Sequence, residues 1–231
     1  SEALLHKDIK EFFDKAIDAQ VMDIFFGTNG VLMDEEMCEF LVQKQVARVE
    51  VSLDAATPET YLRVRSKDEL RTVEKNVRKL IEIKSKHNSK FPIIRLCFCV
   101  LDINKHEQKD FINKWEGLVD YIDLQQEVDF SYVNELCATG TVAHMDSLAE
   151  LSTEKIHCAY PFNSLNVFSD GTITPCCNFH ATHPSMALGN VHKDKLVDVW
   201  NGDRINKIRQ ELLSGEPNPV CRVCLGERSR C

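Results

Sequence analysis

Ten cysteines occur in this 231-residue chain, and six of them follow residue 157. Four of the six are spaced as ligands of a metal centre would be: Cys158, then Cys176, then the pair Cys221-x2-Cys224. Thiolates prefer soft metals, and a site built only from thiolates indicates zinc or an iron–sulfur cluster. A disulfide framework is disfavoured because nothing in the sequence indicates secretion. The spacing therefore predicts one metal centre with these four cysteines as ligands.

A hairpin is predicted to bring Cys176 back toward Cys158. Asp170-Gly171 lies between two short runs of alternating apolar residues. This pattern is typical of a two-residue turn in which both residues have positive φ. Cys177 would project differently from its neighbour Cys176 and is not needed as a ligand, whereas Cys231 is a further candidate.

Two histidines keep a zinc site open as an alternative. His180 and His183 follow the paired cysteines closely. The Cys221-x2-Cys224 pair with Cys158, Cys176 or either histidine would satisfy tetrahedral zinc. The other histidines, including His6, His87 and His106, have no predicted partner and are expected to face solvent.

The first half of the chain has the pattern of a parallel α/β sheet. Strands alternating with helices indicate βα units. Predicted strands cover residues 21–26, 46–53, 92–101 and 121–125, and predicted helices cover residues 7–19, 34–44, 67–86 and 107–115. The first strand would be an unpaired edge, apolar on both faces, and such an edge is a liability in an isolated protein. Residues 127–156 lack periodicity and are predicted to be a linker.

The cysteine pattern resembles the SPASM domain of the radical SAM superfamily and its shorter twitch form. Cys158-x12-Gly171-x4-Cys176 fits the opening of the SPASM pattern, and Cys221-x2-Cys224 fits its continuation. The full pattern then expects Cys-x5-Cys-x3-Cys, whereas this chain has Cys224-x6-Cys231. The one-cluster twitch form fits better, and the resemblance implies an auxiliary 4Fe–4S cluster on the four cysteines.

The strand ends resemble those of the radical SAM partial barrel. The hexapeptide around Glu2 is similar to the end of its second strand, Thr28-Asn29-Gly30 to the end of its third, and residues 49–54 to its fourth. Ligands of α/β folds lie at the carboxyl ends of the strands. The resemblance implies that Glu2 contacts the amino group of S-adenosyl-L-methionine (SAM) and Ser52 its carboxylate. Thr28, Asn29 and Asp54 would line the same pocket, although each residue taken singly also fits a turn or a helix cap.

The superfamily's Cys-x3-Cys-x2-Cys motif, which holds its reducing cluster, does not occur in these 231 residues. Cys38, Cys97 and Cys99 are interpreted as buried apolar residues. One interpretation is an incomplete piece of a longer polypeptide, since the chain starts at Ser1 without a Met. The other is a degenerate relative that uses the fold for binding.

The expected fold is α/β with two domains. Residues 1–126 would form a partial (β/α) barrel of parallel strands whose N-terminal part is missing. Residues 127–156 would be the linker, and residues 157–231 a small α+β cluster-binding domain with a β-hairpin. Residues 128–150 are expected to lie near the substrate, and no catalytic residue is assigned.

The resemblance implies a radical SAM oxidoreductase or a peptide or natural-product maturase. Its 5′-deoxyadenosyl radical would abstract a hydrogen atom from a small-molecule or peptide substrate, and flavodoxin or ferredoxin would supply electrons. Two alternatives remain open. One is a cluster-bearing module for electron transfer or recognition without SAM chemistry, and the other is a structural zinc protein.

Composition excludes several other classes. The net charge of −8 argues against a nucleic-acid or anionic-membrane binder, because both need a basic face. No apolar run approaches the length of a membrane span, and no signal-peptide pattern opens the chain. Hydrophobic content of 43% and charged content of 28% are typical of a globular protein, and a cytoplasmic location is expected.

Overall fold

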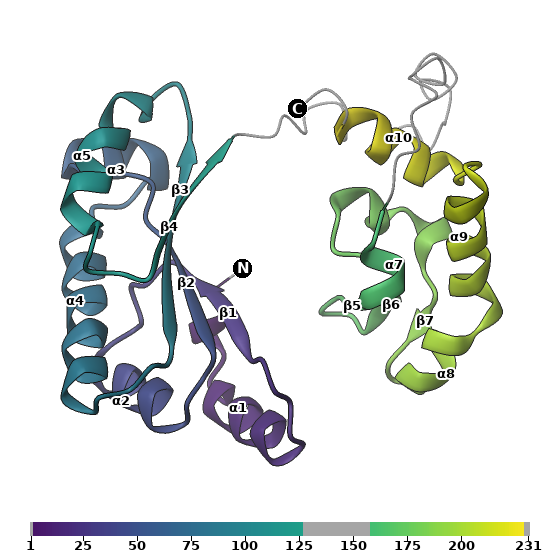
Figure 1. Ribbon diagram of the computed structural model, residues 1–231, viewed down its shortest axis with the longest axis horizontal. Helices are drawn as coiled ribbons and strands as arrows, with labels where there is room; N and C mark the ends of the chain where they lie inside the picture. The colour runs from purple at the N-terminus through teal and green to yellow at the C-terminus, as the bar shows by residue number, and fades with distance from the viewer. Residues whose placement is uncertain (1, 127–157, 229–231) are drawn as a thin grey trace. The chain divides into compact units, whose positions relative to one another are not determined.

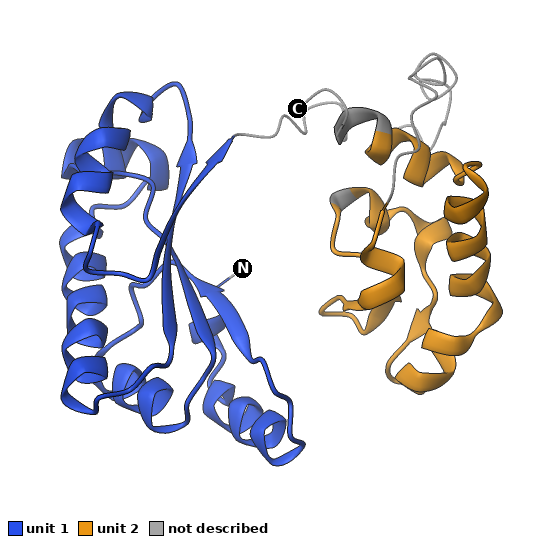
Figure 2. Cartoon of the chain, viewed as in Figure 1, with its two compact units in different colours: residues 1–128 blue, residues 129–231 orange. Residues whose placement is uncertain are grey.

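The computed structural model describes residues 2–126 and 158–228, and the chain divides into two compact units, residues 1–128 and 129–231 (Figure 1, Figure 2). The expected linker, the expected substrate region and Cys231 lie outside the described residues. In unit 1 the elements are η1 (Ala3–Leu5), α1 (Ile9–Asp18), β1 (Phe25–Thr28), α2 (Glu35–Gln43), β2 (Arg48–Ser52), α3 (Pro58–Arg65), α4 (Leu70–Lys86), β3 (Ile93–Val100), η2 (Lys105–Glu107), α5 (Gln108–Trp115) and β4 (Tyr121–Gln126). In unit 2 they are α7 (Tyr160–Asn163), β5 (Asn166–Val167), β6 (Thr172–Thr174), η5 (Phe179–Thr182), η6 (Pro184–Met186), β7 (Gly189–Asn190), α8 (Leu196–Asn201), α9 (Asp203–Ser214) and α10 (Pro219–Arg228).

Unit 1 is built on a four-stranded sheet in the order β1-β2-β3-β4, and each neighbouring pair is parallel. Parallel strands need crossover connections, and helices supply them here. The α/β class and the parallel sheet are therefore confirmed. Since all four strands run the same way, their carboxyl ends lie at one edge of the sheet.

The two faces of this sheet differ in chemistry. Val49 and Leu96 are fully buried on the face that carries α2, α3, α4 and α5 (Figure 1). Alternate residues of the same strands point the other way, because side chains along a strand alternate. On that second face Arg95 forms ion pairs with Glu50 and Asp123. One face is thus an apolar core, and the other is the polar inner surface of an open barrel.

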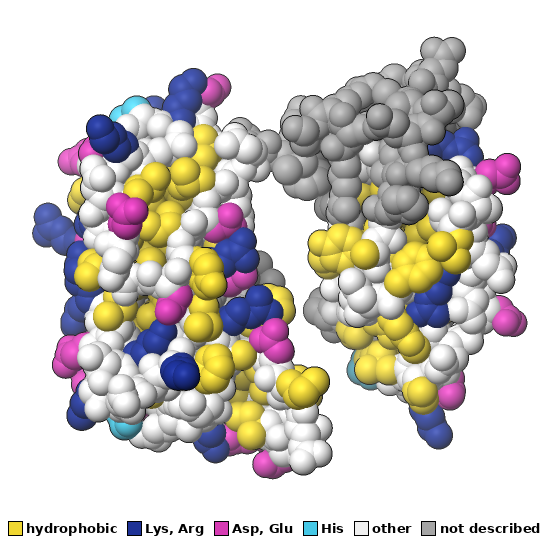
Figure 3. All heavy atoms as spheres, viewed as in Figure 1, with side chains coloured by type: hydrophobic (Ala, Val, Ile, Leu, Met, Phe, Trp, Pro, Cys, Tyr) yellow, Lys and Arg dark blue, Asp and Glu magenta, His cyan; other side chains and the backbone are white. Residues whose placement is uncertain are grey.

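The first strand was predicted four residues too early. Strand β1 begins at Phe25, whereas Val21 is 50% exposed and Met22 is 97% exposed. The ladder starts with the partner strand: Phe25 pairs with Arg48, the first residue of β2, and the preceding Ile24 carbonyl accepts the N–H groups of Ala47 and Arg48. The prediction of an apolar edge nevertheless holds, because β1 is the edge strand and Phe25 is 54% exposed. Figure 3 shows hydrophobic side chains at this surface, over β1 and α1.

A helix that the sequence analysis did not predict follows β2. Helix α3 starts with Pro58, and the Thr57 side chain accepts a hydrogen bond from the Thr60 backbone N–H. Threonine at the N-cap and proline at the first helical position are a standard start signal. The signal was therefore present in the sequence, but the helix is only 8 residues long and its periodicity is weak.

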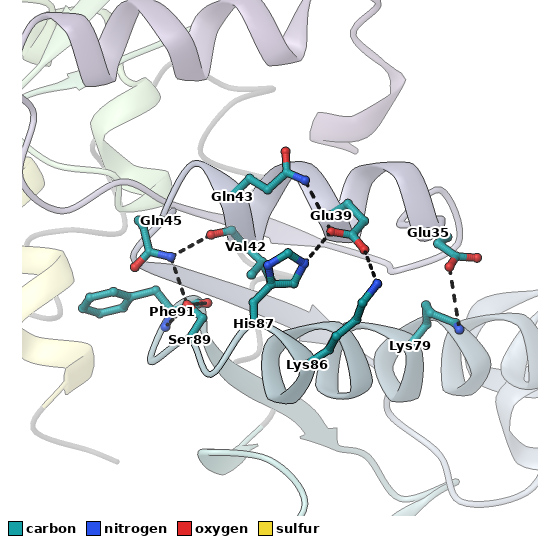
Figure 4. A network of polar contacts seen from close by, with 10 residues as sticks. All are labelled: Glu35, Glu39, Val42, Gln43, Gln45, Lys79, Lys86, His87, Ser89 and Phe91. Carbon is teal, nitrogen blue, oxygen red and sulfur yellow. Dashed lines mark hydrogen bonds and ion pairs between the residues drawn. The ribbon is translucent and has the colours of Figure 1, made fainter.

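Surface polar contacts join α2 to α4 near the amino-terminal side of the sheet (Figure 4). Glu39 of α2 contacts Lys86 and lies 3.0 Å from His87 Nε2, and Glu35 pairs with Lys79. His87 therefore has a partner, contrary to the prediction. Exposed ion pairs contribute little, about 0–1 kcal/mol each, so the buried residues between these helices hold them together.

Unit 2 contains a small antiparallel sheet in the order β5-β6-β7. The predicted hairpin is present as β5–β6, but its turn differs from the prediction. Phe168 and Thr172 still pair, so the loop has three residues, and of Asp170 and Gly171 only Gly171 has positive φ, at +84°. A glycine in this conformation ends the common three-residue hairpin loop. A Cβ at this position would also lie 2.7 Å from the His192 ring.

The remaining cysteines of unit 1 behave largely as predicted. Cys38 and Cys97 are buried, and Cys99 is half-buried. Burial raises the pKa of the Cys38 thiol to about 12 and that of the Cys97 thiol to about 11. Thiols in such surroundings are poor nucleophiles.

A buried carboxylate holds the loop between β2 and α3. Glu107 accepts hydrogen bonds from the backbone N–H groups of Ala56 and Thr57 and from the hydroxyls of Thr57 and Thr60. Burial alone would raise the pKa of Glu107, but these four donors outweigh it and the pKa lies below the ordinary value. Glu107 therefore ties the strand-end loop to the start of α5.

We expect Glu107→Gln to lower the free energy of unfolding by about 2 kcal/mol at pH 7, because charge-assisted hydrogen bonds are lost. A depressed folded-state pKa stabilises the protein above the unfolded pKa of about 4.3, and this stabilisation is lost as the pH falls through the folded value. The difference between wild type and variant should therefore shrink below about pH 4 in urea titrations followed by circular dichroism. The exposed Glu82→Gln is the control, and a difference that persists unchanged in acid would contradict this account.

Candidate metal centre and cofactor pocket

The four predicted ligand cysteines line one cavity in unit 2. Cys158 precedes α7, Cys176 follows β6, and Cys221 and Cys224 lie one turn apart on α10. The rest of the cavity wall is mainly apolar and comprises Tyr160, Pro161, Pro175, Asn178, His180, Ala181, Met186, Val220 and Leu225. Cys177 is exposed and does not belong to this wall. Three separate segments thus deliver four thiols to one apolar cavity.

The donor set of this cavity fits a 4Fe–4S cluster, because such a cluster is held by four cysteine thiolates. The same thiolates are also ligands of zinc. His180 lines the cavity, whereas His183 contacts the Ser185 hydroxyl at 2.8 Å.

The thiols affect one another electrostatically. Burial is the main cause that raises the pKa of Cys221 to about 12. A hydrogen bond from Asn218 opposes this rise, and repulsion from thiolates at Cys176, Cys158 and Cys224 adds to it. Four thiolates would therefore repel one another in this cavity unless a positive centre offset their charge. A bound metal would supply that positive charge and favour the thiolate form of its ligands.

Neighbouring contacts fix the segments that carry the cysteines. Arg209 of α9 donates to the Pro161 carbonyl at 2.8 Å and to the Trp200 carbonyl at 2.9 Å, and its guanidinium lies 4.3 Å from the centre of the Trp200 ring. Pro161 belongs to α7, directly after Cys158. The Thr174 hydroxyl donates to the Cys176 carbonyl at 3.0 Å. The cavity wall is therefore anchored to α9 and to the hairpin.

In unit 1 the structure joins three of the predicted SAM-pocket residues. Glu2 accepts hydrogen bonds from the Thr28 hydroxyl at 2.8 Å, the Asn29 N–H at 2.6 Å and the Leu4 N–H at 3.0 Å. A carboxylate offers about four acceptor positions, so one remains for a ligand amino group. The Asn76 amide donates to the Gly30 and Val31 carbonyls and holds the loop that follows β1. This group fits the role expected of Glu2.

Ser52 and Asp54 lie at the end of the neighbouring strand and differ in accessibility. Ser52 is half-buried and ends β2, next to the end of β1. Asp54 is 5% exposed; it accepts the Cys99 N–H at 2.7 Å and forms an ion pair with Arg65. Its backbone is left-handed, at φ +54°, and Asn104 donates to its carbonyl. The Asp54 carboxylate is thus held by protein partners at the carboxyl edge of the sheet.

The sequence analysis did not identify the residues that hold the loops at the carboxyl edge of the sheet. Asn104 and Glu107 follow β3 and reach back to the loop after β2, about 50 residues earlier. Their positions after a predicted strand were the available signal, because polar residues at strand ends often serve the site. Their partners could not be read from the sequence.

Comparisons with known proteins agree with this arrangement. Residues 1–113 match the radical SAM superfamily, and residues 158–225 match the SPASM iron–sulfur cluster-binding domain. A probable GTP 3',8-cyclase of Methanocaldococcus jannaschii is 28% identical over 139 residues, which are 58% of this chain and 44% of that protein. An S-adenosyl-L-methionine-dependent 2-deoxy-scyllo-inosamine dehydrogenase of Niallia circulans is 22% identical over 116 residues, 48% of this chain and 46% of its own length.

These matches span less than half of the length of either relative. Among solved structures, Streptococcus suis SuiB covers 91% of this chain and 56% of its own, at 12% identity and a TM-score of 0.48. None of the helices in the described residues has the length and apolar character needed to cross a membrane. The matched segments together take in β1, β2 and β3 of the parallel sheet and the four cavity cysteines, and the chain belongs to the radical SAM superfamily and carries a SPASM domain.

Proposed function

We propose that this chain is the SAM-binding and auxiliary-cluster part of a radical SAM oxidoreductase or of a peptide or natural-product maturase. The observation that carries the proposal is the single cavity lined by Cys158, Cys176, Cys221 and Cys224. The polar group at the carboxyl ends of β1 and β2 supports it. The substrate is a small molecule or a peptide.

Bound SAM, reduced by one electron and cleaved to methionine, would supply a 5′-deoxyadenosyl radical for hydrogen abstraction, and an auxiliary cluster held by the four cysteines would supply an electron acceptor or a site that positions the substrate. The chain's own residues bind and orient these groups. Glu2 offers an acceptor to the SAM amino group, and Ser52 offers a hydroxyl to its carboxylate. Asn29 and Thr28 hold Glu2 in place. The apolar wall around the cysteines excludes water from the cluster.

The proposed reaction needs two components that these residues do not supply. The Cys-x3-Cys-x2-Cys motif of the reducing cluster does not occur in the 231 residues, so the active enzyme needs it from sequence beyond them. An acidic low-potential protein of the flavodoxin or ferredoxin class would supply electrons.

The missing motif favours a second candidate, a cluster-bearing module for electron transfer or recognition without SAM chemistry. The coding sequence upstream of the Ser1 codon separates the two. A Cys-x3-Cys-x2-Cys motif there supports the enzyme, and a start codon directly before Ser1 supports the module.

Replacing Cys221 or Cys224 by Ala should remove most of the iron and the broad visible absorption after anaerobic reconstitution, because a cluster that loses one of its four thiolates is no longer held. Unit 2 should also become less stable, since metal binding and folding are coupled. Cys97→Ala and Cys99→Ala are matched controls in unit 1 and should keep their iron. Full iron content in the Cys221 and Cys224 variants would refute the ligand assignment.

Glu2→Gln should weaken SAM binding about tenfold, or about 1.4 kcal/mol, because the glutamine oxygen attracts an ammonium group less strongly than a carboxylate does. The measurement is anaerobic titration calorimetry with SAM on the complete polypeptide that the gene encodes. Glu36→Gln on α2 is the control, since Glu36 is exposed and pairs with Lys10. Equal affinities for wild type and Glu2→Gln would remove Glu2 from the pocket.

A further inference from the structure

The side chain of Asn218 makes a specific set of contacts around Cys221. Its Nδ2 lies 3.3 Å from the Cys221 sulfur and 3.3 Å from Glu211 Oε2. Its Oδ1 accepts the backbone N–H of Cys221 at 3.0 Å. One amide group therefore caps the start of α10 and donates to a cavity thiol.

These contacts also fix which way the amide points. The Cys221 backbone N–H can only donate, so the atom facing it must be the amide oxygen. The amide nitrogen then faces the sulfur and the carboxylate, and both of these accept. A flipped amide would place a donor against a donor, and the sulfur would lose its hydrogen bond.

The loop geometry keeps Asn218 in place. Helix α9 ends at Ser214 and is capped by Gly215, which has the left-handed conformation at φ +80°. The chain reaches Asn218 three residues after Gly215. The Glu211 carboxylate of α9 holds one amide hydrogen, and the Arg222 N–H donates to the Asn218 carbonyl at 2.9 Å. The second amide hydrogen is thereby directed at the Cys221 sulfur.

A hydrogen bond to a ligand sulfur changes the redox behaviour of the bound cluster. Reduction adds negative charge to the cluster and its sulfurs, so an N–H donor stabilises the reduced form more than the oxidised form. Hydrogen bonds to sulfur and burial are known levers on the reduction potential of iron–sulfur clusters. We propose that Asn218 is a positioning residue that raises the reduction potential of the auxiliary cluster by donating to the Cys221 sulfur. This inference rests on the proposed function, because it requires Cys221 to be a ligand.

The test is a redox titration of the anaerobically reconstituted full chain, followed by its visible absorption. Asn218→Ser keeps an N-cap oxygen for α10 and removes the amide donor. Asn218→Asp keeps the shape and replaces the donor by a negative charge. We expect Asn218→Ser to make one-electron reduction about tenfold less favourable, a downward shift of about 59 mV, and Asn218→Asp to lower the potential further.

Asn206→Ser is the matched control. Asn206 also lies in unit 2, but its amide donates to the Asn201 carbonyl and its oxygen accepts from Arg209. The auxiliary cluster of Asn206→Ser should have the same reduction potential as that of wild type. Iron content and far-ultraviolet circular dichroism confirm that each variant is folded and loaded.

Two results would overturn the inference while leaving the cluster assignment intact: an unchanged potential in both Asn218 variants, or an equal shift in Asn206→Ser. Iron retained by Cys221→Ala would be a different failure, since it would remove Cys221 from the ligand set and overturn the proposed function together with the inference.

Discussion

The convergence of four half-buried thiols on one cavity is the constraint on which unit 2 depends. Its apolar core is small and centres on Ile173, Ile205 and Leu212. Cys158, Cys176 and Cys221 pack against that same core. Burial and the neighbouring cysteines raise the pKa of the Cys221 thiol. A cluster that neutralises them would therefore act on the stability of the whole unit.

Unit 1 depends on a different constraint, the common direction of its four strands. Because they are parallel, the loops that follow β1, β2 and β3 meet at one edge of the sheet. These loops are held by long-range hydrogen bonds with Glu2, Asn76, Asn104 and Glu107, together with local ones from the Gly30 N–H to the Thr28 hydroxyl and from the Val31 N–H to the Asn29 side chain. Preorganised polar groups of this kind are what a cofactor pocket needs.

Under the proposed function, unit 1 would orient SAM and unit 2 would carry the auxiliary cluster. The helix-free face of the sheet in unit 1 supports this division, because its Glu50–Arg95–Asp123 ion pairs are polar and partly accessible. In most globular proteins, another layer of apolar side chains covers such a face of a parallel sheet. An open barrel uses the face for ligands instead.

Much of this protein followed from local patterns in the sequence. The alternation of apolar runs and amphipathic segments predicted the parallel sheet, and most element bounds lie within a few residues. The four cavity cysteines were selected by spacing alone, because soft metals require thiolates whatever the fold. The hairpin was predicted too, although Gly171 carries the positive φ alone.

Only the tertiary structure decided which polar groups meet. The start of β1 depends on where its partner β2 begins, and no local pattern encodes that register. The sequence indicated Asp54 as a pocket residue, but it did not show that Cys99 and Arg65 each contact one of its carboxylate oxygens. No sequence motif marks Glu107 or Asn218. Their roles depend on hydrogen-bond donors and acceptors that other segments of the chain supply. Residue type and spacing determine the chemistry that is available, whereas the fold determines the atoms toward which each polar group points.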